Sequence, residues 1–365
     1  MQLNRESTMV FSLFRKKENK KTEEKYLKVR IKEIIKVASD AVNVVFDPLE
    51  NEVNYRPGQF LTIIDEVKGV KLRRAYSLCS SPYLDKYPAI TVKRVEKGQM
   101  SNHINDRYKE GQMIRIMEPM GIFTTDFSAE NSRQIVLIGG GSGITPLYSL
   151  IKSLLHIESK SQIILIYGNK SMDHVIFKDD LNLLKDQYHN FNWINILEED
   201  PDSHADHIGR PTVDMLTFIL KGLAVSDKAE YFICGPKPMM EVVQTTLEIS
   251  KVPKSQISIE SFSAKQTAST DIVSEKVSVS ILLEGTTHEL KADSQKPILE
   301  QALMSDIDMP YSCKSGFCTA CRGKVTEGQV SIEDAQGLSD DEIAEGYVLL
   351  CVGKALSSVV KIEMD

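Results

Sequence analysis

Three cysteines fall within nine residues of one short stretch of the chain. The stretch reads PYSCKSGFCTACRGK over residues 310–324, and it contains Cys313, Cys318 and Cys321, half of the six cysteines in the sequence. A disulfide framework would distribute an even number of cysteines along the chain. Several thiolates close together, completed by one ligand from further along the sequence, are typical of a metal site. The pattern therefore indicates metal chemistry.

The spacing of these cysteines, C-x4-C-x2-C, is that of a plant-type [2Fe–2S] cluster. Such a cluster needs four thiolates on two irons, and Cys351, thirty residues further on, is the only other cysteine in this part of the sequence. Gly316 and Gly323 suit a loop that wraps a cluster and donates N–H groups to its sulfurs. Structural zinc is the alternative, but zinc usually takes two CxxC pairs, and only Cys318 and Cys321 have that spacing.

Two stretches in the first third of the chain carry cations, the first beside a tyrosine and the second before a glycine-opened turn. The first, residues 73–82, reads RRAYSLCSSP and stands where a predicted strand should end. The second, residues 92–104, reads VKRVEKGQMSNHI, in which Gly98 and Ser101 open a short predicted helix. The N-terminus of a helix is suited to a phosphate group. Neither stretch is decisive alone, because an arginine can be a surface cation and a tyrosine a core residue.

Four further turns follow predicted strands in the middle of the chain. They read GGGSGITP at residues 139–146, YGNK at 167–170, CGPKPMM at 234–240 and IESF at 259–262. Open α/β sheets bind ligands at the carboxyl ends of strands, so these turns are candidates for a coenzyme site. The glycine turn could instead serve tight packing alone, and IESF could be an ordinary strand end.

Taken together, these motifs resemble the ferredoxin–NADP reductase superfamily, and CKSGFCTACRGKV resembles the cluster loop of plant-type ferredoxins. The resemblance covers residues 26–365. It implies an antiparallel β-barrel flavin domain, an α/β nicotinamide domain with a parallel sheet, and a β-grasp ferredoxin domain. The metal ligands that it implies are Cys313, Cys318, Cys321 and Cys351.

The same resemblance gives roles to residues of the flavin site. Arg74 would pair its fork of donors with the FAD pyrophosphate, Tyr76 would pack on the flavin, and the Ser77 hydroxyl would lie near the flavin N5 atom. The motif GxxS, in place of the sequence of FMN enzymes, favours FAD. The other flavin-binding residues that it implies are Ala75, Val92, Lys93, Gly98, Met100, Ser101, Thr145 and Phe262.

For the coenzyme, the resemblance places Cys234 beside the nicotinamide and the YGNK turn at the adenosine ribose. Ser77, Cys234 and Glu260 would together tune the arrival of hydride at the flavin, with no separate general base. The other coenzyme-binding residues that it implies are Gly140, Gly141, Ser142, Gly143, Tyr167, Gly168, Asn169, Lys170, Gly235, Pro236 and Met239.

The hydrophobic pattern supplies the elements that must hold these residues. Short alternating strands between Gly- and Pro-bearing turns predict an antiparallel barrel over residues 26–128. Strands that alternate with helical segments predict a parallel sheet with crossover helices over residues 129–262. Small polar residues predict a linker at 263–274, and the cysteine-containing segment follows at 275–365. Residues 1–25 have the composition of a disordered tail.

Bulk properties narrow the class of protein. The net charge is −7, which argues against general nucleic-acid binding, and no apolar run approaches the 18 residues of a membrane span. At the start of the sequence the apolar patch comes before the basic run, which is the wrong order for a secretory signal. We therefore expect a cytoplasmic protein in a reducing compartment, where disulfides are rare.

The combination of cofactors predicts a function. NAD(P)H gives up two electrons as hydride, a [2Fe–2S] cluster carries one, and a flavin between them can accept the pair and release it singly. The order of flavin, nicotinamide and ferredoxin domains resembles that of the reductase components of bacterial oxygenases. In its general sequence pattern the chain resembles the reductase of the di-iron phenylacetyl-CoA epoxidase. The expected activity is that of an oxidoreductase with an oxygenase as acceptor. Reductases of steroid, alkane or acyl hydroxylases are alternatives, as is a flavin and iron–sulfur redox sensor without turnover.

Charge suggests how the coenzyme and the acceptor are recognised. Asn169, Lys170 and Ser171 follow the second strand of the nicotinamide domain, and the first acid is Asp173, so a 2′-phosphate and hence NADPH is favoured, with NADH as the alternative. Residues 275–365 hold 16 Asp and Glu against 8 Lys and Arg, a net charge of −8. This acidity predicts that the oxygenase docks near the ferredoxin domain, although it could serve solubility alone.

Overall fold

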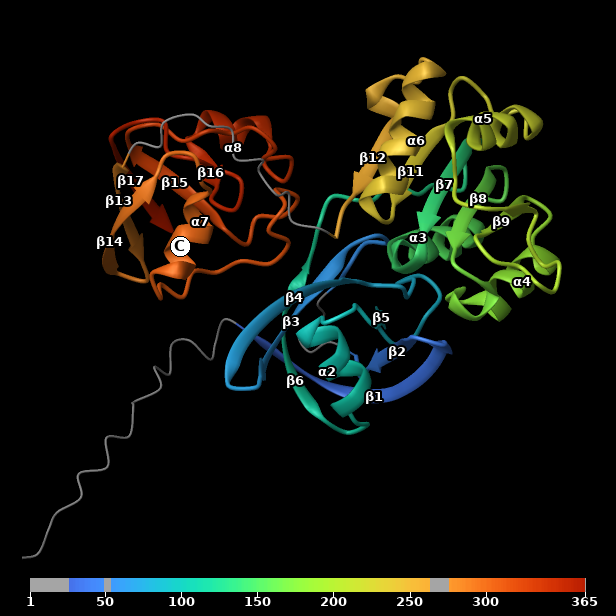
Figure 1. The fold of residues 1–365 in the computed structure, drawn as a ribbon, viewed down its shortest axis with the longest axis horizontal. Helices are drawn as coiled ribbons and strands as arrows, with labels where there is room; N and C mark the ends of the chain where they lie inside the picture. The colour runs from blue at the N-terminus through green and yellow to red at the C-terminus, as the bar shows by residue number, and fades with distance from the viewer. Residues whose placement is uncertain (1–25, 49–53, 263–275, 365) are drawn as a thin grey trace, which may run out of the picture.

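The structure, a computed structural model, describes residues 26–48, 54–262 and 276–364. These residues form three sheets in three successive parts of the chain (Figure 1). The predicted tail at 1–25 and the predicted linker at 263–274 lie outside the described residues. None of the described helices is both long and apolar enough to cross a membrane.

The first sheet is antiparallel and curls into an incompletely closed barrel. Its strand order, β4-β3-β6-β1-β2-β5, makes β4 and β5 its two edges, and one isolated bridge, Leu78 to Ile90, joins them. Alternate side chains of the strands point inward, which explains the period-2 pattern of the sequence. The elements are β1 (Leu27–Ala38), β2 (Ala41–Phe46), β3 (Phe60–Val67), β4 (Val70–Ser77), β5 (Ala89–Lys93), α2 (Gln99–Arg107) and β6 (Met113–Met120).

The second sheet is parallel, with the order β10-β9-β8-β7-β11-β12. The chain runs from β7 outward to β10 and then crosses back to β11, so the order reverses between β7 and β11. Ligands of open α/β sheets bind at such a reversal point. The elements are β7 (Gln134–Gly140), η2 (Gly141–Gly143), α3 (Ile144–Ile157), β8 (Gln162–Asn169), η3 (Met172–His174), α4 (Lys178–Gln187), β9 (Phe191–Leu197), β10 (His207–Ile208), α5 (Val213–Gly222), β11 (Glu230–Cys234), α6 (Lys237–Ile249), η4 (Lys254–Gln256) and β12 (Ile257–Glu260).

The third sheet contains the C-terminal strands in the order β14-β13-β17-β15-β16, with β13 and β17 parallel and the other pairs antiparallel. It encloses a hydrophobic core of its own, which includes Cys321 and Cys351. The elements are β13 (Lys276–Leu283), β14 (Thr286–Asp293), α7 (Ile298–Met304), β15 (Arg322–Glu327), α8 (Asp340–Ala344), β16 (Tyr347–Leu349) and β17 (Val359–Met364).

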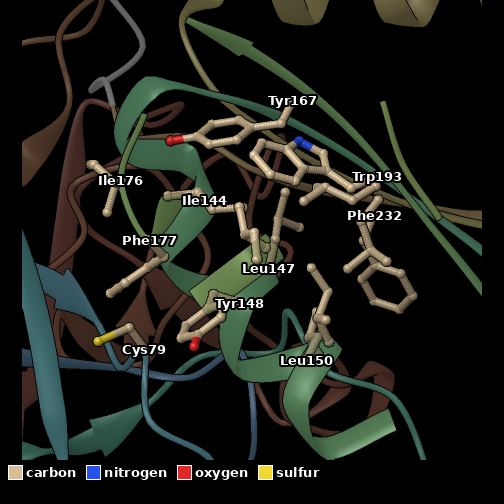
Figure 2. Close-up of a cluster of buried hydrophobic side chains, with 14 of the residues drawn as sticks. Cys79, Ile144, Leu147, Tyr148, Leu150, Tyr167, Ile176, Phe177, Trp193 and Phe232 are labelled. Atoms are coloured by element: carbon tan, nitrogen blue, oxygen red, sulfur yellow. The ribbon is translucent and has the colours of Figure 1, made fainter. Parts of the chain in front are cut away.

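One hydrophobic cluster crosses from the barrel into the parallel sheet. Figure 2 shows Cys79 of the barrel beside α3 side chains such as Tyr148, with Tyr167 and Trp193 of the second sheet further along. Burial raises the pKa of the Cys79 thiol to about 11, so this cysteine is a neutral packing residue. A buried hydrogen bond from the Ser149 hydroxyl to the Ser80 carbonyl, at 2.6 Å, joins the same two units.

The predicted fold class is confirmed. An antiparallel curled sheet precedes a parallel sheet with crossover helices, and a separate mixed sheet carries the cysteine loop. The hydrophobic pattern of the sequence changes near residue 129 and again near residue 275, and the kind of sheet changes at the same two places.

Candidate functional site

The structure brings the four predicted cluster cysteines together. Cys313, Cys318 and Cys321 lie in the loop before β15, and Cys351 follows β16, which pairs with β15. The Sγ atoms of Cys313 and Cys318 are 3.2 Å apart. The nearby Cys313 and Cys321 raise the pKa of the Cys351 thiol, so this cysteine joins the same group. All of these cysteines are free thiols, so no disulfide competes for them.

The donor set fits a two-iron cluster better than one metal ion. Cys313 lies beside Cys318, and Cys351 lies beside Cys321, so the thiols meet in pairs, which suits two irons that each take two thiolates. The backbone N–H of Ser315 points to Cys313 Sγ at 3.5 Å, as a donor to a bound sulfur should.

The two glycines of the cysteine loop differ in their roles. Gly316 has φ of +80°, and a Cβ there would collide with the Asp334 carbonyl, so the loop needs glycine to wrap as predicted. Gly323 lies within β15, where a Cβ would stand 2.6 Å from the Ile362 side chain. Close packing, and not the cluster loop, therefore explains Gly323.

The flavin motif lies at the opening of the barrel. Beyond the bridge at Leu78 and Ile90, the pairing in the described residues joins β4 only to β3 and β5 only to β2. The facing edges, with Tyr76 and Ser77 on β4 and Val92 near the end of β5, thus leave backbone groups that can hydrogen-bond a flat ring. A flavin inserted at this opening would satisfy them.

A cavity of about 310 Å³ brings all three parts of the chain together. Its volume is in the range of small-molecule sites. The flavin motif and the end of β12 form one side, and the cysteine loop forms another. The lining residues are Phe60, Arg73, Arg74, Ala75, Ser77, Glu260, Ser261, Phe262, Ser312, Cys313, Lys314, Ser315 and Phe317.

The three predicted catalytic residues converge beside this cavity. Ser77 Oγ donates a hydrogen bond to Glu260 Oε2 at 3.1 Å. Cys234 and Glu260 are register partners on the neighbouring strands β11 and β12. Burial raises the pKa of the Glu260 carboxyl to about 8, an effect that the Ser77 hydrogen bond partly opposes and the Cys313 charge increases. Burial likewise raises the pKa of the Cys234 thiol, so both groups are mainly neutral at pH 7.

The predicted phosphate end of the flavin site is the start of α2. Gly98 caps this helix without a side-chain hydrogen bond, which leaves N–H groups of the first turn as donors. Ser101 Oγ accepts from Val95 N–H at 3.1 Å, so its hydroxyl shapes the turn. Met100 is buried in the barrel core and anchors the helix. Arg74 is exposed, and its Nη1 donates to the Arg73 carbonyl at 2.8 Å.

The glycine turn after β7 packs directly on the turn after β11. A Cβ on Gly143 would collide with the Cys234 carbonyl, and one on Gly140 would stand 2.7 Å from Pro236 and from Met239. Packing therefore requires these two glycines, as the alternative interpretation of the sequence held. The turn nevertheless lies at the strand-order reversal, where a coenzyme is expected.

A predicted coenzyme residue, Tyr167, and a predicted flavin residue, Thr145, support the glycine turn from within. The buried Tyr167 donates its hydroxyl hydrogen bond to the Gly141 carbonyl at 2.8 Å. Thr145 Oγ1 donates to the Ser142 carbonyl at 3.0 Å, which holds the turn against the start of α3. These two hydrogen bonds thereby fix the backbone of Gly141 and Ser142.

The end of β8 carries the predicted ribose site. Lys170 is exposed, and both amide atoms of Asn169 are buried without a hydrogen-bond partner in the described residues, as a ligand-binding amide would be. A pair that the sequence motifs do not indicate lies beside it. Arg210 forms a salt bridge with Glu198 at 3.0 Å, and the Glu198 N–H donates to the Asn169 carbonyl. No motif joins these residues, because only the pairing of β8 with β9 brings them together.

Comparison with known proteins bears on each of the three parts. Three protein-family models match in succession: "Oxidoreductase FAD-binding domain" over residues 28–125, "Oxidoreductase NAD-binding domain" over 137–245, and "2Fe-2S iron-sulfur cluster binding domain" over 281–356. The matches cover the barrel, most of the parallel sheet and the cysteine-containing unit respectively. All three predicted types of cofactor site are thus confirmed.

Similarity also extends along nearly the whole chain. One of the subunits of the 1,2-phenylacetyl-CoA epoxidase of Escherichia coli K12 is 35% identical over 338 residues, with 89% of this chain and 94% of that protein covered. The ferredoxin reductase component of the 3-ketosteroid-9-alpha-monooxygenase of Rhodococcus rhodochrous is 31% identical over 348 residues, with 90% and 94% covered. The solved phthalate dioxygenase reductase, 24% identical, has a TM-score of 0.58 over 94% of this chain and 99% of its own, a likeness of fold.

The raised pKa of Glu260 predicts a pH dependence. As the pH rises through about 8, the carboxyl ionises, and its negative charge opposes the hydride that arrives in the cavity beside it. We expect the rate of flavin reduction by NAD(P)H, followed by stopped-flow absorbance, to fall roughly tenfold across this range. Glu260→Gln keeps an acceptor for Ser77 but cannot ionise, so its profile should be flat. The same fall in both proteins would contradict this role.

Proposed function

Because the chain belongs to the family of oxygenase reductase components that bind FAD, NAD(P)H and a [2Fe–2S] cluster, we propose that it reduces a phenylacetyl-CoA epoxidase. The similarity to a protein that is part of such an epoxidase supports this acceptor over the steroid monooxygenase, whose reductase is less similar. We also propose a cytoplasmic setting, where NAD(P)H is available and thiols stay reduced.

The observation that carries the proposal is the cavity shared by the three units. Ser77 and Glu260 stand on its flavin side and Cys313 stands in the opposite loop, so donor and acceptor residues meet in one space. FAD, when bound, supplies a ring that accepts two electrons together and releases them one at a time. The chain itself orients that ring with the two barrel edges.

Replacement of one cluster cysteine should separate the two halves of the activity. Cys351→Ser should keep FAD and the NAD(P)H-driven reduction of ferricyanide. It should lose iron and sulfide, and its rate of epoxide formation with the epoxidase's oxygenase component should fall at least tenfold. The unmodified protein should contain one FAD and a two-iron, two-sulfide cluster. Cys79→Ser is a control, because Cys79 packs in a different hydrophobic cluster from Cys321 and Cys351. Product formed only with a steroid oxygenase, or full epoxidation by Cys351→Ser, would refute the proposal.

We propose that the acceptor docks on an acidic segment, residues 325–353. The segment holds seven Asp and Glu and no Lys, Arg or His. Its backbone packs on the cluster loop, since a Cβ on Gly337 would stand 2.8 Å from the Cys318 nitrogen. A capping box of Ser339 and Glu342 begins α8 and holds Asp340 and Asp341 exposed. Negative charge beside the cluster would steer a basic face of the oxygenase toward it.

Charge removal on α8 should slow association with the oxygenase. For Asp340→Asn combined with Asp341→Asn, we expect a severalfold lower association rate at low salt and a smaller salt dependence. Stopped-flow reduction of the oxygenase at several salt concentrations measures both. Glu289→Gln, an exposed acid on β14 at the opposite edge of the sheet, is the matched control. A transfer rate that salt does not change would count against docking by charge.

We propose that Lys170 reads the 2′-phosphate and that the protein prefers NADPH. The exposed ammonium of Lys170 at the end of β8 supports this proposal. The neighbouring acid, Glu198, is paired with Arg210 in a salt bridge. Lys170→Ala should lower kcat/KM for NADPH about tenfold and change that for NADH little. Lys185→Ala, an exposed lysine within α4, is the control. If the unmodified protein uses both coenzymes equally, or the variant loses both equally, Lys170 does not read the phosphate.

A further inference from the structure

A buried arginine joins the flavin barrel to the cysteine loop. Arg73 lies on β4, next to the predicted pyrophosphate ligand Arg74, yet only 4% of it is exposed. Its Nη1 donates to the Met309 carbonyl at 2.7 Å, and its Nη2 lies 3.0 Å from the Asp308 carboxylate. No motif gives this arginine a role, because Asp308 and Met309 lie more than 230 residues away from it.

The contacts of Arg73 suit a fixed anchor. Its Nη2 also donates to the Tyr26 hydroxyl at 2.9 Å, and its guanidinium lies 5.1 Å from the centre of the Tyr311 ring. A guanidinium presents its donors in a rigid plane, so several partners fix its position as a lysine could not. The neighbouring pair of Lys71 and Asp308, at 2.9 Å, is more exposed and therefore contributes less.

The partners of Arg73 lead directly to a cluster ligand. The loop continues from Asp308 and Met309 to Ser312, which hydrogen-bonds Thr62 of β3, and then to Cys313. Thr62 is the register partner of Ala75 in the flavin motif. Arg73 and Thr62 thus lie on two strands that border the cavity, β4 and β3. Their contacts with the loop hold Cys313 in the cavity wall.

We propose that Arg73 is a positioning residue for electron transfer from the flavin to the cluster, and that it acts by clamping the segment 308–312 onto β4. The inference rests on the proposed electron path. NAD(P)H loses one hydride, which carries two electrons; these leave the flavin site singly, and each reduces the cluster once after the acceptor has oxidised it. The proton is released to solvent. The clamp sets the separation across which each electron passes.

Two variants from opposite sides of the contact test this clamp in the full-length holoprotein. For Asp308→Ala we expect unchanged flavin reduction by NAD(P)H, and for both Asp308→Ala and Arg73→Ala we expect cluster reduction slowed about tenfold or more. Stopped-flow absorbance separates the two steps. Asp308 does not line the cavity, so its variant remains informative if Arg73→Ala binds FAD poorly. Arg73→Lys, which keeps the charge, should restore part of the rate.

Three further measurements distinguish position from other effects. Midpoint potentials of the flavin and cluster should match those of the unmodified protein. Amide hydrogen exchange of residues 308–312 should increase in both variants, with or without cofactors. In the double variant the two losses should not add, because both remove one contact. Arg30→Ala, which removes an exposed pair with Asp47 elsewhere in the barrel, should leave both rates unchanged.

The outcomes separate this inference from the proposed function. If NAD(P)H fails to reduce the cluster of the unmodified protein, the proposed function itself is wrong. If the unmodified protein reduces its cluster normally and both alanine variants do so at the same rate, or if the variants slow it only through changed potentials, the clamp is overturned.

Discussion

The hydrogen bond between Ser77 and Glu260 is the contact on which the arrangement of the site depends. It joins residues 183 positions apart, at the end of the outer barrel strand and at the end of the last parallel strand. A carboxyl group is costly to bury, and the raised pKa of Glu260 reflects that cost. The position is tolerable because the group is neutral and hydrogen-bonded, and because the hydrophobic cluster around α3 holds the two units rigidly together. With this contact in place, Cys234 is fixed beside Glu260 by strand pairing.

Predictions from local sequence patterns were the most reliable. The spacing of Cys313, Cys318 and Cys321 requires only one loop, and the fourth ligand had a single candidate in that part of the chain. The change from alternating strands to strands followed by helices predicted the two kinds of sheet, because side-chain periodicity depends only on neighbouring residues. The fold class was therefore available without any knowledge of contacts between distant segments.

Contacts between distant segments could not be predicted from the sequence. Nothing in the spacing of Arg73 indicates a partner at Met309, and nothing near Lys170 indicates that Glu198 and Arg210 stand beside it. The glycine turn shows a related limit. Gly143 is required because the Cys234 carbonyl leaves no room for a side chain, and a motif cannot distinguish that reason from contact with a coenzyme. Only the distances between atoms of different strands, which the structure supplies, can distinguish these two reasons for a glycine.

The distribution of hydrophobic clusters has a consequence for how the molecule folds and unfolds. One cluster contains side chains of both the barrel and the parallel sheet, whereas the cluster of the C-terminal unit contains only residues from 277 onward. Cooperativity follows shared cores. The chain should therefore behave as two cooperative units and not three: the barrel and the α/β unit melt together, and the iron–sulfur unit melts by itself. Loss of iron–sulfur structure under oxidative damage would then leave the larger unit folded.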